Sequence, residues 1–94
     1  MDDRNVIIVA YDISKDATRT KFSKFLEQYG VRIQYSVFEI QNSDRVLKIV
    51  RNAIKSDFEK MFDPGDSVYV FTTKYSTTER YGSAKLLDND LIII

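Results

Sequence analysis

The chain has 94 residues, zero formal net charge, no cysteine and no histidine. A chain of this length predicts one domain, over residues 1–94. Disulfides and thiolate chemistry are excluded, which fits a protein of the reducing cytoplasm. Without histidine, any bound metal would need oxygen ligands, which favours magnesium or manganese over zinc. No apolar segment is long enough for a signal peptide or a membrane span, so no membrane contact is expected.

The first predicted strand covers Asn5–Tyr11. Its residues Val6–Ala10 are all apolar, which is typical of a central strand with both faces buried. By strand alternation, Tyr11 and Asp12 face opposite sides of the sheet. Asp12 stands at the C-terminal end of this strand, where α/β folds tend to place their chemistry. The alternatives are that Asp12 caps the next helix or forms a salt bridge with Arg32.

Two amphipathic helices are predicted. The first covers Ser14–Tyr29, with Ser14 as N-cap and Gly30 as the C′ residue. The second covers Ser43–Phe62, with Asn42 or Ser43 as N-cap and Asp63-Pro64-Gly65 as its end. Apolar residues recur at helical spacing in both segments: Phe22, Phe25, Leu26 and Tyr29, then Val46, Ile49, Val50, Ala53, Ile54, Phe58 and Met61.

The remaining segments predict strands. Val31–Gln41 is extended, but its alternation changes phase between Val37 and Phe38, so one bent strand and two short strands both remain open. Asp66–Thr73 predicts another strand, Thr77–Tyr81 a short one, and Leu91–Ile94 a C-terminal strand that would pair with a sheet edge. This order predicts an α+β, ferredoxin-like βαββαβ sandwich with an added C-terminal strand.

Two helices cover only one face of such a sheet. The first strand and the strand Asp66–Thr73 are apolar on both faces, so the other face would expose a large apolar patch. We expect a second copy of the chain to cover it, as a homodimer packed sheet to sheet. Tyr69 and Phe71 would lie in this interface or in the core; stacking on nucleic-acid bases is the less favoured alternative.

The neutral total hides two oppositely charged segments. Lys15–Arg32 contains five basic and two acidic residues, whereas Ser56–Asp66 contains four acidic and one basic residue. The basic segment supplies candidate phosphate contacts of nucleic acid: Arg19, Lys21, Lys24 and Arg32. The alternative is an ordinary solvated helix face.

Four pieces of the sequence resemble the Cas2 proteins of CRISPR systems. They are Ala10-Tyr11-Asp12, the pair Arg19 and Lys21, the run YGVRIQYSVFE at residues 29–39, and Asp66-Ser67-Val68. The resemblance extends over almost the whole chain. It implies a ferredoxin-like homodimer that bridges two dimers of a Cas1 integrase and holds duplex prespacer DNA for spacer acquisition.

The resemblance also implies a second activity. Some family members are described as metal-dependent endonucleases of RNA or DNA, and their aspartate at the end of the first strand binds Mg²⁺ between two subunits. In this chain that residue is Asp12, as metal ligand and catalytic group, with Tyr11 and Phe38 near the cleft. The acidic stretch Leu87–Asp90 is a candidate Cas1 contact. A regulatory module that binds a small molecule is the third and least favoured function.

Overall fold

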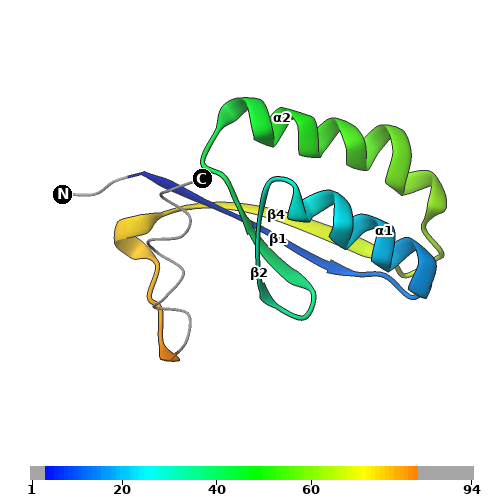
Figure 1. Cartoon of the computed structure of the whole chain (residues 1–94), viewed down its shortest axis with the longest axis horizontal. Coiled ribbons are helices and arrows are strands. Elements are labelled where there is room, and N and C mark those ends of the chain that lie inside the picture. Colours follow the sequence, from blue (N-terminus) through cyan, green and yellow to red (C-terminus); the bar gives the residue numbers. More distant parts are fainter. Residues whose placement is uncertain (1–3, 83–94) are drawn as a thin grey trace.

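The structure is a computed structural model that describes residues 4–82. Its sheet contains β1 (Asn5–Asp12), β2 (Gly30–Gln34), β3 (Val37–Ile40) and β4 (Ser67–Lys74), in the antiparallel order β2-β3-β1-β4. Helices α1 (Asp16–Glu27) and α2 (Asp44–Ala53) lie on one side of this sheet (Figure 1). The predicted α+β, ferredoxin-like arrangement is confirmed.

The core lies between the helices and the face of β1 that carries Ile7, Val9 and Tyr11. These three side chains are at most 6% exposed. Phe22 and Leu26 of α1 and Val46 and Val50 of α2 pack in the same cluster. The Phe22 ring meets the Tyr11 ring edge to face at 5.1 Å and the Phe58 ring at 4.9 Å. The predicted apolar stripes are therefore the core-facing sides of both helices.

The predicted ends of the first helix were wrong. Helix α1 begins at Asp16, and its N-cap is Lys15, which makes no side-chain cap bond. Ser14 does not cap the helix; its backbone N–H and its hydroxyl instead donate hydrogen bonds to the Asp66 carboxylate. Gly30 is not the C′ residue but the first residue of β2. It is required by close packing, because a Cβ there would lie 2.2 Å from the Glu39 carbonyl oxygen.

The second helix begins as predicted and ends differently. The Ser43 hydroxyl accepts from the Val46 N–H. After Ala53 the chain forms a π-helix at Ile54–Phe58 and a 3₁₀ turn at Glu59–Met61. On a regular α-helix Asp57, about three turns beyond Val46, would return to the core face. The wider π turn places Phe58 there instead, and its side chain is buried.

The segment Val31–Gln41 is resolved into two strands rather than one. Strands β2 and β3 are joined by a turn at residues 35–36, and their pairing shifts register between Arg32 and Gln34. The predicted strand Thr77–Tyr81 was wrong: a 3₁₀ turn at Tyr75–Thr77 follows β4, and no strand follows it within residues 4–82. The predicted strand Leu91–Ile94 and the acidic stretch Leu87–Asp90 lie outside the described residues.

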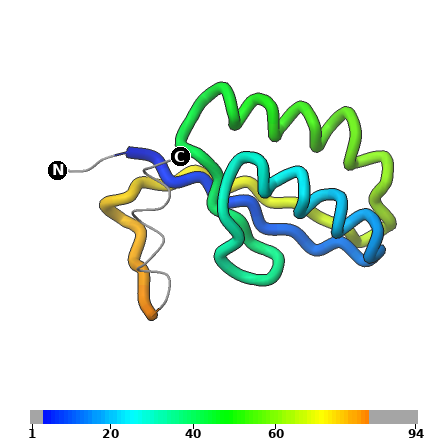
Figure 2. The backbone as a smooth tube through the Cα atoms, viewed as in Figure 1, coloured from blue at the N-terminus to red at the C-terminus, as the bar shows by residue number. Residues whose placement is uncertain are grey.

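The face of the sheet away from the helices, here called the open face, is covered only in part by the described residues. The chain after β4 turns away from α2 and leaves the end of the sheet (Figure 2). Its Arg80 lies against Glu39, and at that end of the sheet Val6 is only 3% exposed. Farther along, Tyr69 is 60% and Phe71 50% exposed, with their rings stacked at 5.8 Å. An apolar strip therefore remains uncovered.

Within residues 4–82, no helix combines the length and the apolar character that crossing a bilayer requires.

Candidate functional site

Asp12 lies at the end of β1 on the open face. It is exposed and stands opposite Ser67 of β4 in the strand pairing. Together with Ala10, Tyr11, Ser67 and Tyr69 it lines a shallow hollow of about 220 Å³. Asp12 does not cap α1 and does not pair with Arg32, which lies on the other side of the sheet, so both predicted alternatives were wrong. The side chain of Asp12 is free of hydrogen bonds and ion pairs to the residues the structure describes.

The surroundings of Asp12 bear on the predicted Mg²⁺ site. Mg²⁺ prefers an octahedral shell of oxygens, usually from one or two carboxylates together with phosphates and water. Among residues 4–82, no group of three acidic side chains is placed to hold a metal. Asp12 and the Ser67 hydroxyl have suitable oxygen chemistry, but they are too few to hold the ion in a single copy. Mg²⁺ would fit here only if a second Asp12 or substrate oxygens completed the shell.

The predicted basic residues lie on the helix side of the sheet. Arg19 of α1 donates to the Ile13 carbonyl at 2.8 Å and also pairs with Asp16. Arg32 of β2 donates to the Tyr35 carbonyl and lies 3.9 Å from a Glu27 oxygen. Lys21 and Lys24 are exposed along α1. Basic side chains therefore sit along α1 and on the neighbouring hairpin.

A hollow between α1 and the β2–β3 turn joins several predicted site residues. Its lining consists of Tyr11, Arg19, Thr20, Ser23, Arg32 and Tyr35. Burial raises the pKa of the Tyr11 hydroxyl, and the charge of Arg32 opposes that shift. The Arg32 guanidinium also lies over the fully buried Phe38 ring at 5.1 Å. The structure thus brings Tyr11, Phe38, Arg19 and Arg32 together and leaves Asp12 on the opposite face.

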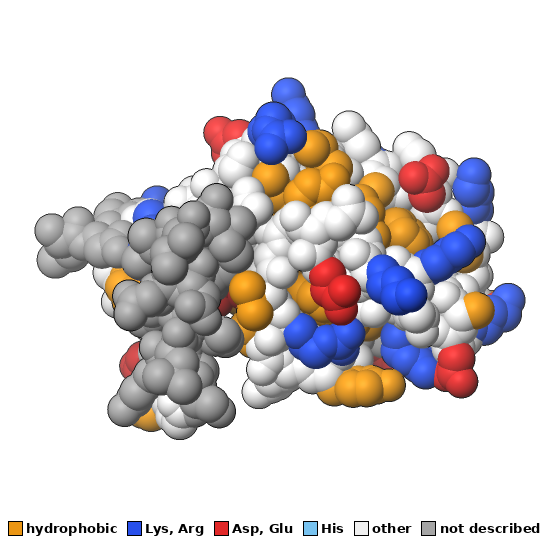
Figure 3. Space-filling model, viewed as in Figure 1, with side chains coloured by type: hydrophobic (Ala, Val, Ile, Leu, Met, Phe, Trp, Pro, Cys, Tyr) orange, Lys and Arg blue, Asp and Glu red, His pale blue; other side chains and the backbone are white. Residues whose placement is uncertain are grey.

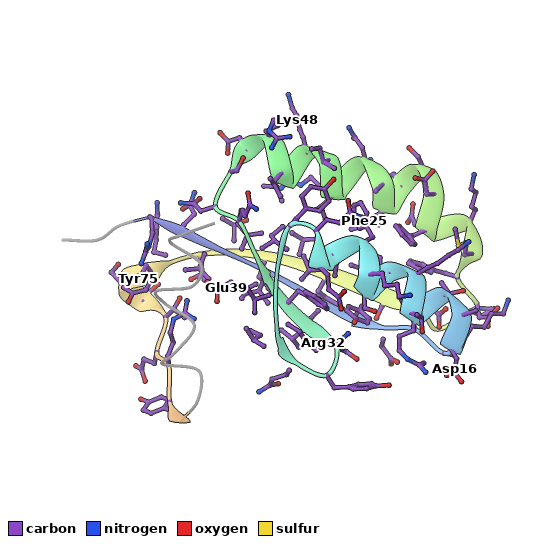
Figure 4. The ribbon with its side chains drawn as sticks, viewed as in Figure 1. Asp16, Phe25, Arg32, Glu39, Lys48 and Tyr75 are labelled. Carbon is purple, nitrogen blue, oxygen red and sulfur yellow. The ribbon has the colours of Figure 1, made fainter. Side chains whose placement is uncertain are left out.

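Figure 4 shows Arg32 beside the β2–β3 hairpin and Lys48 on α2, pointing away from the sheet. In Figure 3 Lys and Arg side chains occur in separate groups over the visible face, with Asp and Glu side chains between them. No continuous basic surface is visible in this view. Phosphate contacts on this side would therefore be made at separate points.

Asp66 fixes the loop between Asp12 and α1. Its carboxylate accepts from the Ser14 N–H and hydroxyl, both at 3.0 Å, and from the Asp63 N–H at 2.9 Å. The same loop is held from the other side by Arg19, which binds the Ile13 carbonyl. Sequence reasoning missed Asp66 as a site residue. One feature of the sequence could have indicated a role for Asp66: it follows the Asp63-Pro64-Gly65 turn and directly precedes a strand.

We expect the stabilising effect of Asp66 to depend on pH. Its pKa is lowered, first by the hydrogen bond from the Asp63 backbone and then, after an opposing effect of desolvation, by the bonds from Ser14. A carboxyl whose folded pKa is lowered stabilises the fold above its unfolded pKa, near 3.8, and loses this effect as pH falls through the folded pKa. Asp66→Asn should therefore lower Tm at pH 7, and the difference from the unmodified protein should shrink as pH falls below 3.8 and through the lowered pKa of the folded state.

Thermal unfolding from pH 2 to pH 7 measures this effect. Asp57→Asn is the matched control, because Asp57 is exposed and makes none of these bonds. A Tm difference for Asp66→Asn that stays constant over the whole range would contradict the assignment.

Glu39 and Arg80 form a buried ion pair on the open face. Two parallel bonds of 2.9 and 3.0 Å join the guanidinium to the carboxylate, and the side chains are 6% and 10% exposed. The Arg80 guanidinium also lies 5.7 Å from the centre of the Tyr75 ring. This pair holds the chain after β4 across one end of the open face.

Residues 5–80 match the sequence profile of the family described as CRISPR associated protein Cas2. The chain belongs to the Cas2 family. A CRISPR-associated endoribonuclease Cas2 of Chloroflexus aurantiacus is 36% identical over 74 residues, which are 78% of this chain and 75% of that protein. A CRISPR-associated endonuclease Cas2 of Thermus thermophilus is 42% identical over 48 residues, 51% of this chain and 53% of that protein.

Solved structures agree with the fold. A hypothetical protein from Thermus thermophilus has a TM-score of 0.66 at 32% identity and covers 85% of this chain and 92% of its own. Streptococcus pyogenes Cas2 at pH 6.5 has a TM-score of 0.63 at 19% identity, and the match covers 82% of this chain and 99% of that protein. A chain of a partial Cas6-RT-Cas1–Cas2 complex has a TM-score of 0.66 at 21% identity, and the match covers 81% of this chain and 89% of that one. The last two likenesses concern the Cas2 fold alone.

Proposed function

We propose that this Cas2-family chain works as a homodimeric adaptor in CRISPR spacer acquisition. Two copies pair through their open faces, hold duplex DNA on their basic helix sides and bind a Cas1-type integrase. The observation that carries the dimer is the uncovered strip at Tyr69 and Phe71, because stacked aromatic rings exposed to water are typical of an interface. The presence of a structurally similar chain in a Cas1–Cas2 complex supports the integrase as partner.

The two faces divide these tasks between them. A second copy on the open face leaves α1 and the hairpin accessible, so Arg19, Lys21, Lys24 and Arg32 stay available to DNA. The same pairing brings the two Asp12 side chains toward a common axis, since both lie on the interface side. Contacts of this kind go to phosphates, so they hold duplex DNA without reading its sequence.

Duplex DNA affinity should fall steeply as salt is added. Each phosphate neutralised by Lys or Arg contributes about 0.9 to the slope of log affinity against log salt. We expect Lys21→Ala to weaken binding and to reduce that slope by about one. Lys60→Ala is the matched control, because it removes the same charge from the acidic segment. Fluorescence anisotropy over a salt series measures both; a slope that does not change in Lys21→Ala would contradict a phosphate contact at this residue.

A metal-dependent endonuclease is the second candidate function. It is favoured by the exposed, unpaired Asp12 carboxylate and by relatives named endoribonuclease and endonuclease. When bound between two Asp12 side chains, Mg²⁺ would supply Lewis-acid chemistry at a phosphodiester of RNA or DNA. The chain's own contribution would be the pair of carboxylates that hold the ion and the basic residues that hold the nucleic acid.

For this second function, Asp12→Asn should abolish Mg²⁺-dependent cleavage while the dimer remains intact. Asparagine keeps the size of the side chain but removes the charge that a hard cation needs. Cleavage of labelled RNA and DNA is measured with Mg²⁺ and with EDTA, beside the dimer's sedimentation. Cleavage that continues unchanged in Asp12→Asn would remove Asp12 from the site.

A further inference from the structure

One peptide group in the loop between β1 and α1 lies between two charged side chains. The Ser14 N–H donates to the Asp66 carboxylate at 3.0 Å. The Ile13 carbonyl accepts from the Arg19 guanidinium at 2.8 Å. Both atoms belong to the single peptide bond that joins Ile13 to Ser14. Because a trans peptide bond directs its N–H and its C=O to opposite sides, Asp66 and Arg19 hold this group from its two ends.

The two hydrogen bonds of this peptide group strengthen each other. A carboxylate at the N–H polarises the peptide, so the carbonyl oxygen at the other end becomes a stronger acceptor. Each bond also has one ionised partner, which makes it stronger than a bond between neutral groups. The negative charge of Asp66 therefore favours the bond that Arg19 makes, although it acts through a neutral peptide group.

Arg19 has a second partner that competes with this arrangement. Its guanidinium also pairs with Asp16 of α1, whose side chain is 89% exposed, whereas the Arg19 side chain is 25% exposed. An exposed carboxylate orients an arginine weakly and occupies N–H groups that an incoming phosphate would use. The Ile13 carbonyl is uncharged, so it orients the guanidinium without cancelling its charge. The bond to Ile13 is therefore the one that keeps Arg19 both fixed and positively charged.

We propose that Asp66 is a positioning residue for Arg19 and acts on it through the Ile13–Ser14 peptide group. Asp66 does not touch nucleic acid itself: its charge fixes the peptide group, and the peptide group fixes the guanidinium that meets a phosphate. The phosphate contact of Arg19 rests on the proposed function, whereas the coupling between Asp66 and Arg19 does not. Without Asp66 the peptide group is free to rotate, and Arg19 turns toward Asp16.

The sign of the change in duplex DNA affinity tests this role. Asp66→Ala removes a negative charge, so the charge of the protein alone predicts tighter binding to a polyanion. The proposal predicts the reverse, binding about tenfold weaker. The slope of log affinity against log salt should also fall by about 0.9, the share of one phosphate contact. Asp63→Ala is the matched control and should not weaken binding, since that carboxylate meets the Ser14 hydroxyl and Lys15 but not the peptide group.

A substitution at Arg19 separates positioning from a general effect on the fold. In an Arg19→Gln background, Asp66→Ala should not weaken duplex binding further, because the group that Asp66 positions is gone. Equal weakening in both backgrounds would indicate a general disturbance and overturn the proposal, as would tighter binding by Asp66→Ala alone. If Asp66→Ala does not stay folded at the temperature of the assay, Asp66→Asn replaces it with the same expected results.

Unfolding in urea tests the coupling without DNA. The double variant should lose about fivefold less in the unfolding equilibrium constant than the separate losses of Asp66→Ala and Arg19→Gln predict together. Additive losses would overturn the proposal. A coupled pair in a protein that binds no duplex DNA would contradict the proposed function and leave the action of Asp66 on Arg19 standing.

Discussion

Arg80→Met should lower the free energy of unfolding by about 3 kcal/mol, a change of more than a hundredfold in the unfolding equilibrium. Methionine fills much of the same volume but leaves Glu39 as a buried carboxylate without its cation. Glu39 is 5% exposed, and both bonds to Arg80 are direct. Because the pair ties the chain after β4 to β3, that segment should also lose its protection against proteases. Equilibrium denaturation in urea measures the first effect and limited proteolysis the second.

A double substitution separates the ion pair from simple loss of packing. Glu39→Leu combined with Arg80→Met replaces both charges by apolar groups and should be clearly more stable than Arg80→Met alone. Arg51→Met is the matched control on α2, where the side chain is exposed, and should cost less than about 0.5 kcal/mol. A loss below about 1 kcal/mol in Arg80→Met would mean that Glu39 is not buried as described.

Phe71→Lys should weaken self-association by about a hundredfold, because an aromatic anchor at the centre of an interface contributes more than 2 kcal/mol. The substitution also brings a charge toward its own copy across a two-fold axis, which adds repulsion. The monomer should stay folded, since Phe71 is half exposed. Sedimentation over a range of concentrations measures the dissociation constant.

Thr72→Lys is the matched control for Phe71→Lys. Thr72 is the next residue on β4, exposed like Phe71, but it pairs with Ile7 on the helix side of the sheet. Equal effects of the two substitutions would show that charge alone, and not the open face, governs association. An unmodified protein that stays monomeric at every concentration would contradict self-association through this strip.

Strand alternation explains why much of the fold could be predicted. The apolar run of β1 marks a central strand, and its alternation places Tyr11 and Asp12 on opposite faces. The stripes of Phe22, Leu26, Val46 and Val50 define the core sides of both helices. These features could be predicted because buried positions recur at the period of a helix or a strand, and apolar residues occupy them.

The details that failed depend on contacts between distant residues. Ser14 has every local property of an N-cap, but Asp66, 52 positions away, takes its hydrogen bonds. The π-helix Ile54–Phe58 was not predicted, although helical spacing did mark Phe58 as a core residue; its ring packs against Phe22 of α1, a contact between distant residues. The residue pairing of β2 and β3 decides that Arg32 lies over Phe38, so the suggested Asp12–Arg32 pair could not be excluded from the sequence alone.

The placement of the two Asp12 side chains is the most direct test of the dimer. Because the chain has no cysteine, Asp12→Cys introduces a single thiol. With a short thiol-to-thiol cross-linker, Asp12→Cys should give a covalent dimer much faster than Lys48→Cys, whose thiol lies on α2 away from the sheet (Figure 4). Cross-linking of Asp12→Cys that is no faster than that of Lys48→Cys would contradict pairing through the open face.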